Sequence, residues 1–123
     1  MNQTFIVKKE HISKYPNPLF VNKNESIWVF DEDTEYPGWI FCKVKSSDKE
    51  GWVPKQIIQL GTDGKSGTVT EDYSARELNV KPGDKLESNR ELNGWVWCVT
   101  EDNEAGWVPR ENLESKIVSR GTF

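Results

Sequence analysis

The stretch Gly94-Trp95-Val96-Trp97-Cys98, followed by Gly106-Trp107-Val108-Pro109, decides the fold because the chain contains it twice. The earlier copy reads Gly38-Trp39-Ile40-Phe41-Cys42 and then Gly51-Trp52-Val53-Pro54. Each copy has an alternating aromatic run, a polar stretch and a short run that stops at proline, which is the pattern of a β-hairpin. Five of the six tryptophans lie in these copies, so coincidence is a poor explanation. The duplication predicts two structural units, although the length of 123 residues alone favours one.

The rest of the chain predicts short strands and turns, with no helix of ordinary length. Apolar and β-branched residues mark strands, and clusters of Asn, Asp, Gly and Pro separate them. One helical turn and a final strand fit after Pro54. The expected strands outside the two hairpins lie at residues 4–7, 19–21, 26–30, 68–72 and 78–80. Five short strands in each half predict an all-β fold of two small barrels.

A Gly-rich segment separates the two expected barrels. Residues 61–67 contain three glycines, a composition typical of a flexible linker. We therefore expect a first repeat at residues 1–60, a linker at 61–67, a second repeat at 68–115 and a tail at 116–123. On this division, limited proteolysis is expected to cut the linker first.

Charge and hydropathy exclude several kinds of partner. The formal net charge of −4 and a pI near 5.1 argue against a surface for nucleic acid or anionic membrane. No apolar run approaches the ~20 residues that span a bilayer. The first residues also lack the basic segment and apolar core of a signal peptide. We expect a cytoplasmic protein that binds neither nucleic acid nor membrane.

The second repeat resembles a Src homology 3 domain. Val69-Thr70-Glu71-Asp72-Tyr73 stands in the place of the family's Ala-Leu-Tyr-Asp-Tyr strand. Glu77-Leu78-Asn79-Val80-Lys81-Pro82-Gly83-Asp84 corresponds to its Glu-Leu-x-Phe-x-x-Gly-Asp turn. Gly94-Trp95 and Gly106-Trp107-Val108-Pro109 then match its Gly-Trp-Trp and Gly-Tyr-x-Pro motifs.

The first repeat fits the same frame more loosely. Val7-Lys8-Lys9-Glu10-His11 stands for the first motif and Leu19-Phe20-Val21-Asn22-Lys23-Asn24-Glu25 for the second, before the duplicated hairpin. The resemblance covers nearly the whole chain. It implies two five-stranded, partly open barrels in tandem, no catalysis and no cofactor, and a shallow groove for proline-rich peptides.

The resemblance also implies which residues line that groove. The matching positions are Trp39, Pro54, Tyr73, Trp95 and Pro109. Other groove tyrosines of the family are replaced, by Lys9 and Glu71 in the first motif and by Ile57 and Asn112 after the late proline. The loop between Tyr73 and Leu78 is shorter than the family's usual loop, which removes much of its specificity wall. Polyproline II ligands lie between aromatic rings, so the groove is expected to be degenerate.

The two cysteines are predicted to be core residues. Strand alternation places Cys42 with Ile40 and Val44 on one face, and Cys98 with Val96. We expect buried, reduced thiols that act as small hydrophobic residues, rather than redox groups or metal ligands. Two cysteines without ligand partners at suitable spacing make no zinc site. No metal is therefore expected.

His11 and an acidic run at residues 31–35 each have a structural and a functional interpretation. His11 is the only histidine, and no nucleophile or acid is placed to make it a catalytic base, so we expect no enzyme activity. The acidic run Asp31-Glu32-Asp33-Thr34-Glu35 could attract a basic partner. A hydrated loop is the favoured interpretation, because charge clusters usually stay solvated.

The expected function is therefore binding. The first hypothesis is a non-catalytic protein- or peptide-binding module with a degenerate proline-rich-peptide groove. The alternative is a structural or assembly protein without an open groove. In that case aromatic faces that include Trp39, Trp52, Trp95 and Trp107 pack between domains or between copies, since large exposed apolar patches usually mark interfaces.

Overall fold

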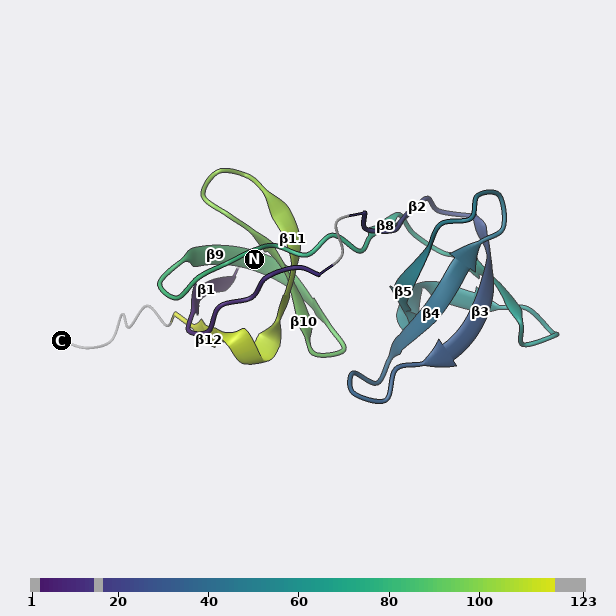
Figure 1. Cartoon of the computed structure of the whole chain (residues 1–123), viewed down its shortest axis with the longest axis horizontal. Helices are drawn as coiled ribbons and strands as arrows, with labels where there is room; N and C mark the ends of the chain where they lie inside the picture. The colour runs from purple at the N-terminus through teal and green to yellow at the C-terminus, as the bar shows by residue number, and fades with distance from the viewer. Residues whose placement is uncertain (1–2, 15–16, 117–123) are drawn as a thin grey trace. The chain divides into compact units, whose positions relative to one another are not determined.

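The computed structural model describes residues 3–14 and 17–116 (Figure 1). The described chain consists of strands, turns and two 3-10 turns, as the all-β expectation required. None of its helical segments is long and apolar enough to cross a membrane. In chain order the elements are β1 (Gln3–Val7), β2 (Phe20–Val21), β3 (Ser26–Glu32), β4 (Trp39–Val44), β5 (Glu50–Pro54), η1 (Lys55–Ile57), β6 (Ile58–Leu60), β7 (Ser66–Val69), β8 (Tyr73–Ser74), β9 (Lys85–Leu92), β10 (Trp95–Val99), β11 (Ala105–Pro109), η2 (Arg110–Asn112) and β12 (Leu113–Ser115).

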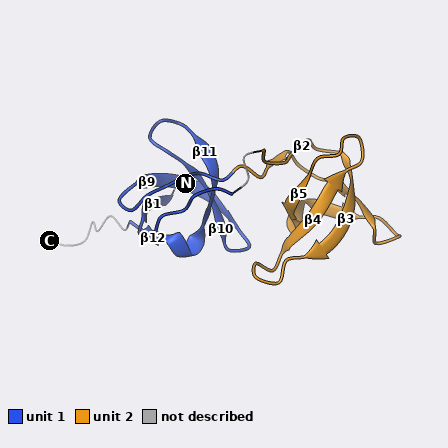
Figure 2. Ribbon diagram, viewed as in Figure 1, with its two compact units in different colours: residues 1–14, 77–123 blue, residues 15–76 orange. Residues whose placement is uncertain are grey.

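Two compact units form, but they do not divide where the sequence predicted. Unit 1 contains residues 1–14 and 77–123, and unit 2 contains residues 15–76 (Figure 2). The expected boundary at residues 61–67 falls inside unit 2. Unit 1 is therefore discontinuous in sequence, because its N-terminal segment is separated from the rest by the whole of unit 2.

Unit 2 is built on a sheet with the strand order β5-β4-β3-β7-β6. The duplicated hairpin of the first repeat supplies β4 and β5, where Phe41 lies opposite Trp52. In the Gly-rich segment, residues 61–65 form the turn that joins β6 to β7, and Ser66 and Gly67 already belong to β7, so its prediction as an interdomain linker is wrong. Asp63 holds this turn through hydrogen bonds from the backbone N–H groups of Lys65 and Ser66, which lower the pKa of its carboxyl. Asx-type bonding gives the segment a defined conformation despite its glycines.

Unit 1 has the matching strand order β11-β10-β9-β1-β12. The duplicated hairpin of the second repeat supplies β10 and β11, where Trp97 lies opposite Trp107. The first strand of the chain, β1, lies between β9 and β12, and Figure 1 shows this purple strand beside the green and yellow ones. Leu113–Ser115 forms β12, whereas residues 117–123 of the expected tail lie outside the described residues.

The two sheets exchange their first strands. By sequence, β1 opens the first repeat and β7 opens the second. In the structure β1 pairs with β9 and β12 of the second repeat, while β7 pairs with β3 and β6 of the first. Closure of each sheet into a barrel stays a prediction.

Each unit has an apolar core to which inward-facing strand residues contribute, as the alternating pattern predicted. The unit 1 core consists of Phe5, Val7, Leu78, Val80, Leu86, Val96, Cys98, Val108 and Leu113. Cys42 and Cys98 are both buried free thiols, which confirms their assignment to the core. Burial raises the pKa of each thiol to about 12, because desolvation disfavours the thiolate.

Candidate functional site

In unit 2 three of the residues predicted to line a groove come together. Trp39 begins β4 directly after Gly38, whose φ of 100° is open to glycine but strained for other residues. Trp39 lies opposite Pro54, the last residue of β5. Tyr73 comes from β8, which pairs with β2, and its ring lies 6.4 Å from that of Trp39 between centroids. Strand exchange thus places the tyrosine of the second repeat beside the tryptophan and proline of the first.

This set of rings is closed rather than open. Trp39 is 6% exposed and Tyr73 is 8% exposed. The Tyr73 hydroxyl donates a 2.9 Å hydrogen bond to the backbone carbonyl of Trp52, which fixes the ring against β5. A ligand could stack on these rings only if they became more exposed.

In unit 1 the corresponding pair is Trp95 and Pro109, which face each other across β10 and β11. Trp95 is half-buried, and so more open to solvent than Trp39. The residue that packs against it is His11, whose ring meets the Trp95 ring edge-on at 5.5 Å between centroids. His11 occupies the position in the first motif that corresponds to Tyr73, so both exchanged segments deliver an aromatic side chain to the tryptophan of the other repeat.

His11 is held by an acidic partner. Its Nε2 lies 2.8 Å from Oε1 of Glu77, and the two side chains are only 17% and 14% exposed. The backbone on either side is paired as well, since His11 and Val80 exchange both N–H···O bonds. Such a partly buried pair is better fixed than a surface ion pair, which usually contributes little. The sequence did not predict that His11 lies beside Trp95.

Asn112 is the second residue whose role at this site the sequence did not predict. It replaces a groove tyrosine of the resembled family and lies buried in η2. Its side-chain amide donates to the backbone carbonyls of Lys9 (3.2 Å) and Glu10 (3.1 Å), and so fixes the segment that leads to His11. The sequence did contain one signal for this role. Asn112 is a polar residue at the position where the other repeat has the apolar Ile57, and a buried side-chain amide needs hydrogen-bond partners.

An exposed aromatic row lies on the outer face of the unit 2 sheet. Phe30 packs against Phe41 at 6.2 Å, and Phe41 meets Trp52 edge-on at 5.2 Å between ring centroids. Phe30 is 53% exposed, and Trp28 on the same strand is 43% exposed with the ammonium of Lys45 above its ring. We call Trp28, Phe30, Phe41 and Trp52 the aromatic row. In unit 1, the rings of Trp97 and Trp107 meet at 5.2 Å between centroids.

The acidic run at residues 31–35 forms hydrogen bonds within its own loop, and the described residues contain no group of metal ligands. Glu32 accepts a hydrogen bond from the backbone N–H of Gly38, and Asp33 accepts one from that of Glu35, so part of the acidic run stabilises its own loop. Among residues 3–14 and 17–116, no cluster of three His, Cys, Asp or Glu side chains could hold a metal ion.

Comparison with known proteins supports the resemblance for the first repeat. Residues 4–61 match the model of the variant SH3 domain family. This match begins at β1 and ends after β6, so it follows the sequence repeat and crosses the boundary between the two units.

Curated relatives contain the same type of domain. The SH3 and PX domain-containing protein 2B of Mus musculus and that of Homo sapiens are each 28% identical to this chain over 110 residues. The alignment covers 76% of this chain, which spans about a tenth of those proteins. The chain also aligns with a solved structure described as "CBDP35 Native structure". The alignment covers 94% of this chain and 97% of the solved chain, at 14% identity and a TM-score of 0.33. Of these comparisons, the match at residues 4–61 is the one that indicates a domain family, the variant SH3 domain.

Proposed function

We propose that this protein is a non-catalytic protein-binding module and that its more open binding surface is centred on Trp95 in unit 1. The observation that carries the proposal is the half-buried Trp95 ring, packed against a His11 side chain that Glu77 holds in place. Tryptophan at a partly open site combines a large apolar surface with a hydrogen-bond donor, and is enriched among residues that dominate binding. The variant SH3 match adds support, because such domains are interaction modules.

The ligand class we propose is a peptide segment of another protein that contains proline. Simple proline-rich peptides are expected to bind weakly, with dissociation constants no better than ~100 μM, or about −5.5 kcal/mol. The reason is that Trp95 and Pro109 remain, while His11 and Asn112 stand where the resembled family has tyrosines. Polyproline II helices bind in slots between aromatic rings, so fewer rings mean fewer slots. The second set, Trp39, Pro54 and Tyr73, contributes only if its rings open.

Isothermal titration with a panel of proline-containing peptides tests this proposal on the full chain. Trp95→Ala is expected to abolish the weak heat signal, whereas Trp28→Ala, which removes an exposed tryptophan of the other unit, leaves it unchanged. Low-micromolar binding that Trp95→Ala removes would show that the groove is complete and that the expected weakness is wrong. Binding that survives Trp95→Ala and disappears in Trp28→Ala would move the site to unit 2.

A second candidate function is assembly through the aromatic row. An apolar patch that includes Phe30 and Trp28 at more than two-fifths exposure is typical of a surface that another molecule covers. We propose a second copy of the chain as that molecule. Of the four tryptophans expected in such packing, Trp52 and Trp95 are half-buried and stay part of this candidate, whereas Trp39 and Trp107 are buried and do not. Sedimentation velocity with Phe30→Ser is the test. A dimer that the substitution dissociates supports assembly, and a monomer at all concentrations excludes it.

A further inference from the structure

We propose that the exchange of first strands between the two repeats is obligatory, so that neither repeat can complete its sheet with its own first strand. This inference is independent of the binding function proposed above. It rests on comparing equivalent positions, which the strand registers define. Ile6 lies opposite Glu114 in unit 1, and Thr68 lies opposite Gln59 in unit 2, so Ile6 and Thr68 are equivalent. On the same basis Phe5 is equivalent to Gly67.

The first reason is side-chain volume at this equivalent position. Phe5 is buried in the unit 1 core, opposite Leu86, and its ring faces the guanidinium of Arg110 at 5.1 Å. Gly67 has no such room. A Cβ added there would lie 2.9 Å from Cγ2 of Ile58 and 3.1 Å from the Gln59 carbonyl oxygen.

Each strand therefore fits only the sheet in which it is found. If β1 replaced β7 in unit 2, the Phe5 ring would collide with backbone and side chain at a site too tight for a methyl group. If β7 replaced β1 in unit 1, Gly67 would leave the Phe5 space empty. Overpacking and cavities both destabilise a core, so both misplacements are disfavoured together.

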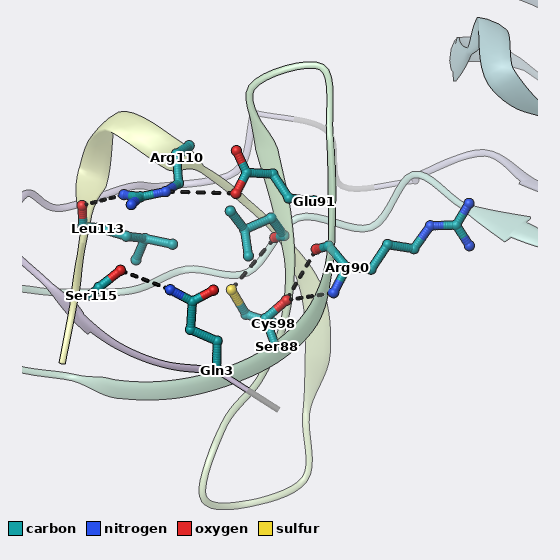
Figure 3. Close-up of polar contacts among 9 residues, drawn as sticks. Gln3, Ser88, Arg90, Glu91, Cys98, Arg110, Leu113 and Ser115 are labelled. Atoms are coloured by element: carbon teal, nitrogen blue, oxygen red, sulfur yellow. Dashed lines mark hydrogen bonds and ion pairs between the residues drawn. The ribbon is translucent and has the colours of Figure 1, made fainter. Parts of the chain in front are cut away.

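A polar contact favours the same arrangement. The side-chain amide of Gln3 in β1 donates a 2.8 Å hydrogen bond to the hydroxyl of Ser115 in β12 (Figure 3). The position equivalent to Ser115 in the first repeat is Leu60, because Leu60 lies opposite Gly67 as Ser115 lies opposite Phe5. A leucine side chain cannot accept this bond, so the first repeat lacks the partner that Gln3 uses.

The second reason is the connection that follows β8. In unit 2 the backbone N–H of Ala75 bonds to the carbonyl of Leu19, next to the pairs Phe20–Ser74 and Val21–Tyr73. Leu78 is the equivalent of Leu19 in the second repeat, as the sequence motifs show. If the second repeat made this pairing within itself, Ala75 would bond to Leu78 and only Arg76 and Glu77 would remain to reverse the chain.

Arg76 and Glu77 are poor residues for such a reversal. Two-residue hairpin loops use type I′ or II′ turns, which need positive φ at one or both central residues and favour Gly, Asn or Asp. The first repeat has more room, because residues 14–18 would separate Ser13 from Leu19. Since exchange is reciprocal, a second repeat that cannot close on itself obliges the first repeat to exchange as well. Shortened hinge loops are a known route to exchanged elements.

Engineered disulfides in the full chain distinguish the two arrangements. In the exchanged structure, residues 6 and 114 lie directly opposite each other, so the variant with Ile6→Cys and Glu114→Cys can form a bridge there. In the variant with Ile6→Cys and Gln59→Cys, the two cysteines would face each other only if β1 completed the sheet of the first repeat. Directly opposed residues in antiparallel strands are ~4.5–5.5 Å apart between Cα atoms, which suits a disulfide. The native cysteines are buried and so do not compete.

We expect the 6–114 bridge to form about a hundredfold faster than the 6–59 bridge, and within one chain, because the exchanged strands are held at high effective concentration. Mass spectrometry of peptides from oxidised protein identifies both bridges. Equal rates for the two pairs would overturn obligatory exchange. A 6–114 bridge found only in covalent dimers would overturn exchange within one chain.

A designed reversal tests the causes. Phe5→Gly with Gly67→Phe exchanges the two volumes, and a Gly-Ser insertion of about six residues between Arg76 and Glu77 relaxes the turn. The combined variant is expected to form the 6–59 bridge. If it folds and still forms only the 6–114 bridge, the assigned causes are wrong. If it does not fold, the single substitution Gly67→Ala decides. Gly67→Ala is expected to slow the 6–114 bridge, because its methyl group clashes in unit 2, and an unchanged rate overturns the volume argument.

Discussion

The side-chain amide of Asn112 offers the sharpest test of how unit 1 holds the segment that carries His11. In Asn112→Ala the carbonyls of Lys9 and Glu10 lose hydrogen bonds of 3.2 and 3.1 Å. A hydrogen bond contributes about 0.5–1.5 kcal/mol net, so the two together predict a loss of about 1–3 kcal/mol in the free energy of unfolding. With a urea m-value of about 1–3 kcal/mol/M, the unfolding midpoint should fall by roughly 1 M.

Asn112→Asp sharpens this test through its pH dependence. At neutral pH its carboxylate would face two carbonyl oxygens, so it should destabilise unit 1 more than Asn112→Ala. The protonated form can still donate one bond, which raises the folded-state pKa of this carboxyl above the unfolded value of about 3.9. The stability supplied by the protonated form is then fully present below about pH 4 and is lost as pH rises through the folded-state pKa.

The measurement is urea unfolding followed by circular dichroism at several pH values. Glu114→Ala, an exposed change on the adjacent strand β12, is the control and should shift the free energy of unfolding by no more than about 0.5 kcal/mol. The reasoning fails if Asn112→Ala behaves like this control. It also fails if Asn112→Asp is as stable as the unaltered protein at neutral pH.

Three further outcomes are expected. Burial raises the pKa of Cys42 and of Cys98 to about 12, so both thiols should react slowly with thiol reagents at pH 8 and quickly after unfolding. Fast labelling of the native protein, or a disulfide detected by mass spectrometry, would contradict their place in the core. Tyr73→Phe removes the hydroxyl bond to the Trp52 carbonyl and should cost about 1 kcal/mol in urea unfolding, so no loss would mean that the ring is not fixed there. Gly67→Ala should cost about 1–3 kcal/mol through overpacking, and a gain in stability would refute the tight contact with Ile58.

Local patterns predicted most of the strands and the core positions. The alternation around Cys42 and Cys98 placed both thiols inward, because a strand directs successive side chains to opposite faces whatever lies beside it. The same rule placed Phe41 and Trp52 on a shared outer face, where they meet as a cross-strand pair. Such features depend on neighbours in sequence and on the nearest hairpin strand.

The candidate site was predictable only in part. Trp95 and Pro109 face each other because they end paired strands of one hairpin, a relation that the motif spacing contains. The position of His11 beside Trp95 required two segments 84 positions apart in the numbering to meet, and no local pattern encodes that contact. Glu77 was assigned only to a turn motif, although the structure pairs it with His11.

The amino-acid sequence by itself determined the strand pattern, the duplicated hairpins and many of the inward-facing positions, since these follow from alternation, turn residues and burial of apolar side chains. Only the tertiary structure decided which first strand completes which sheet. Backbone hydrogen bonding is nearly the same for either choice, so the order of motifs along the chain could not reveal the exchange. The difference lies in long-range fit: Phe5 fills space in unit 1, and Gly67 avoids contact with Ile58 in unit 2. Side-chain volume can select between strands only when both candidate neighbours are present in three dimensions.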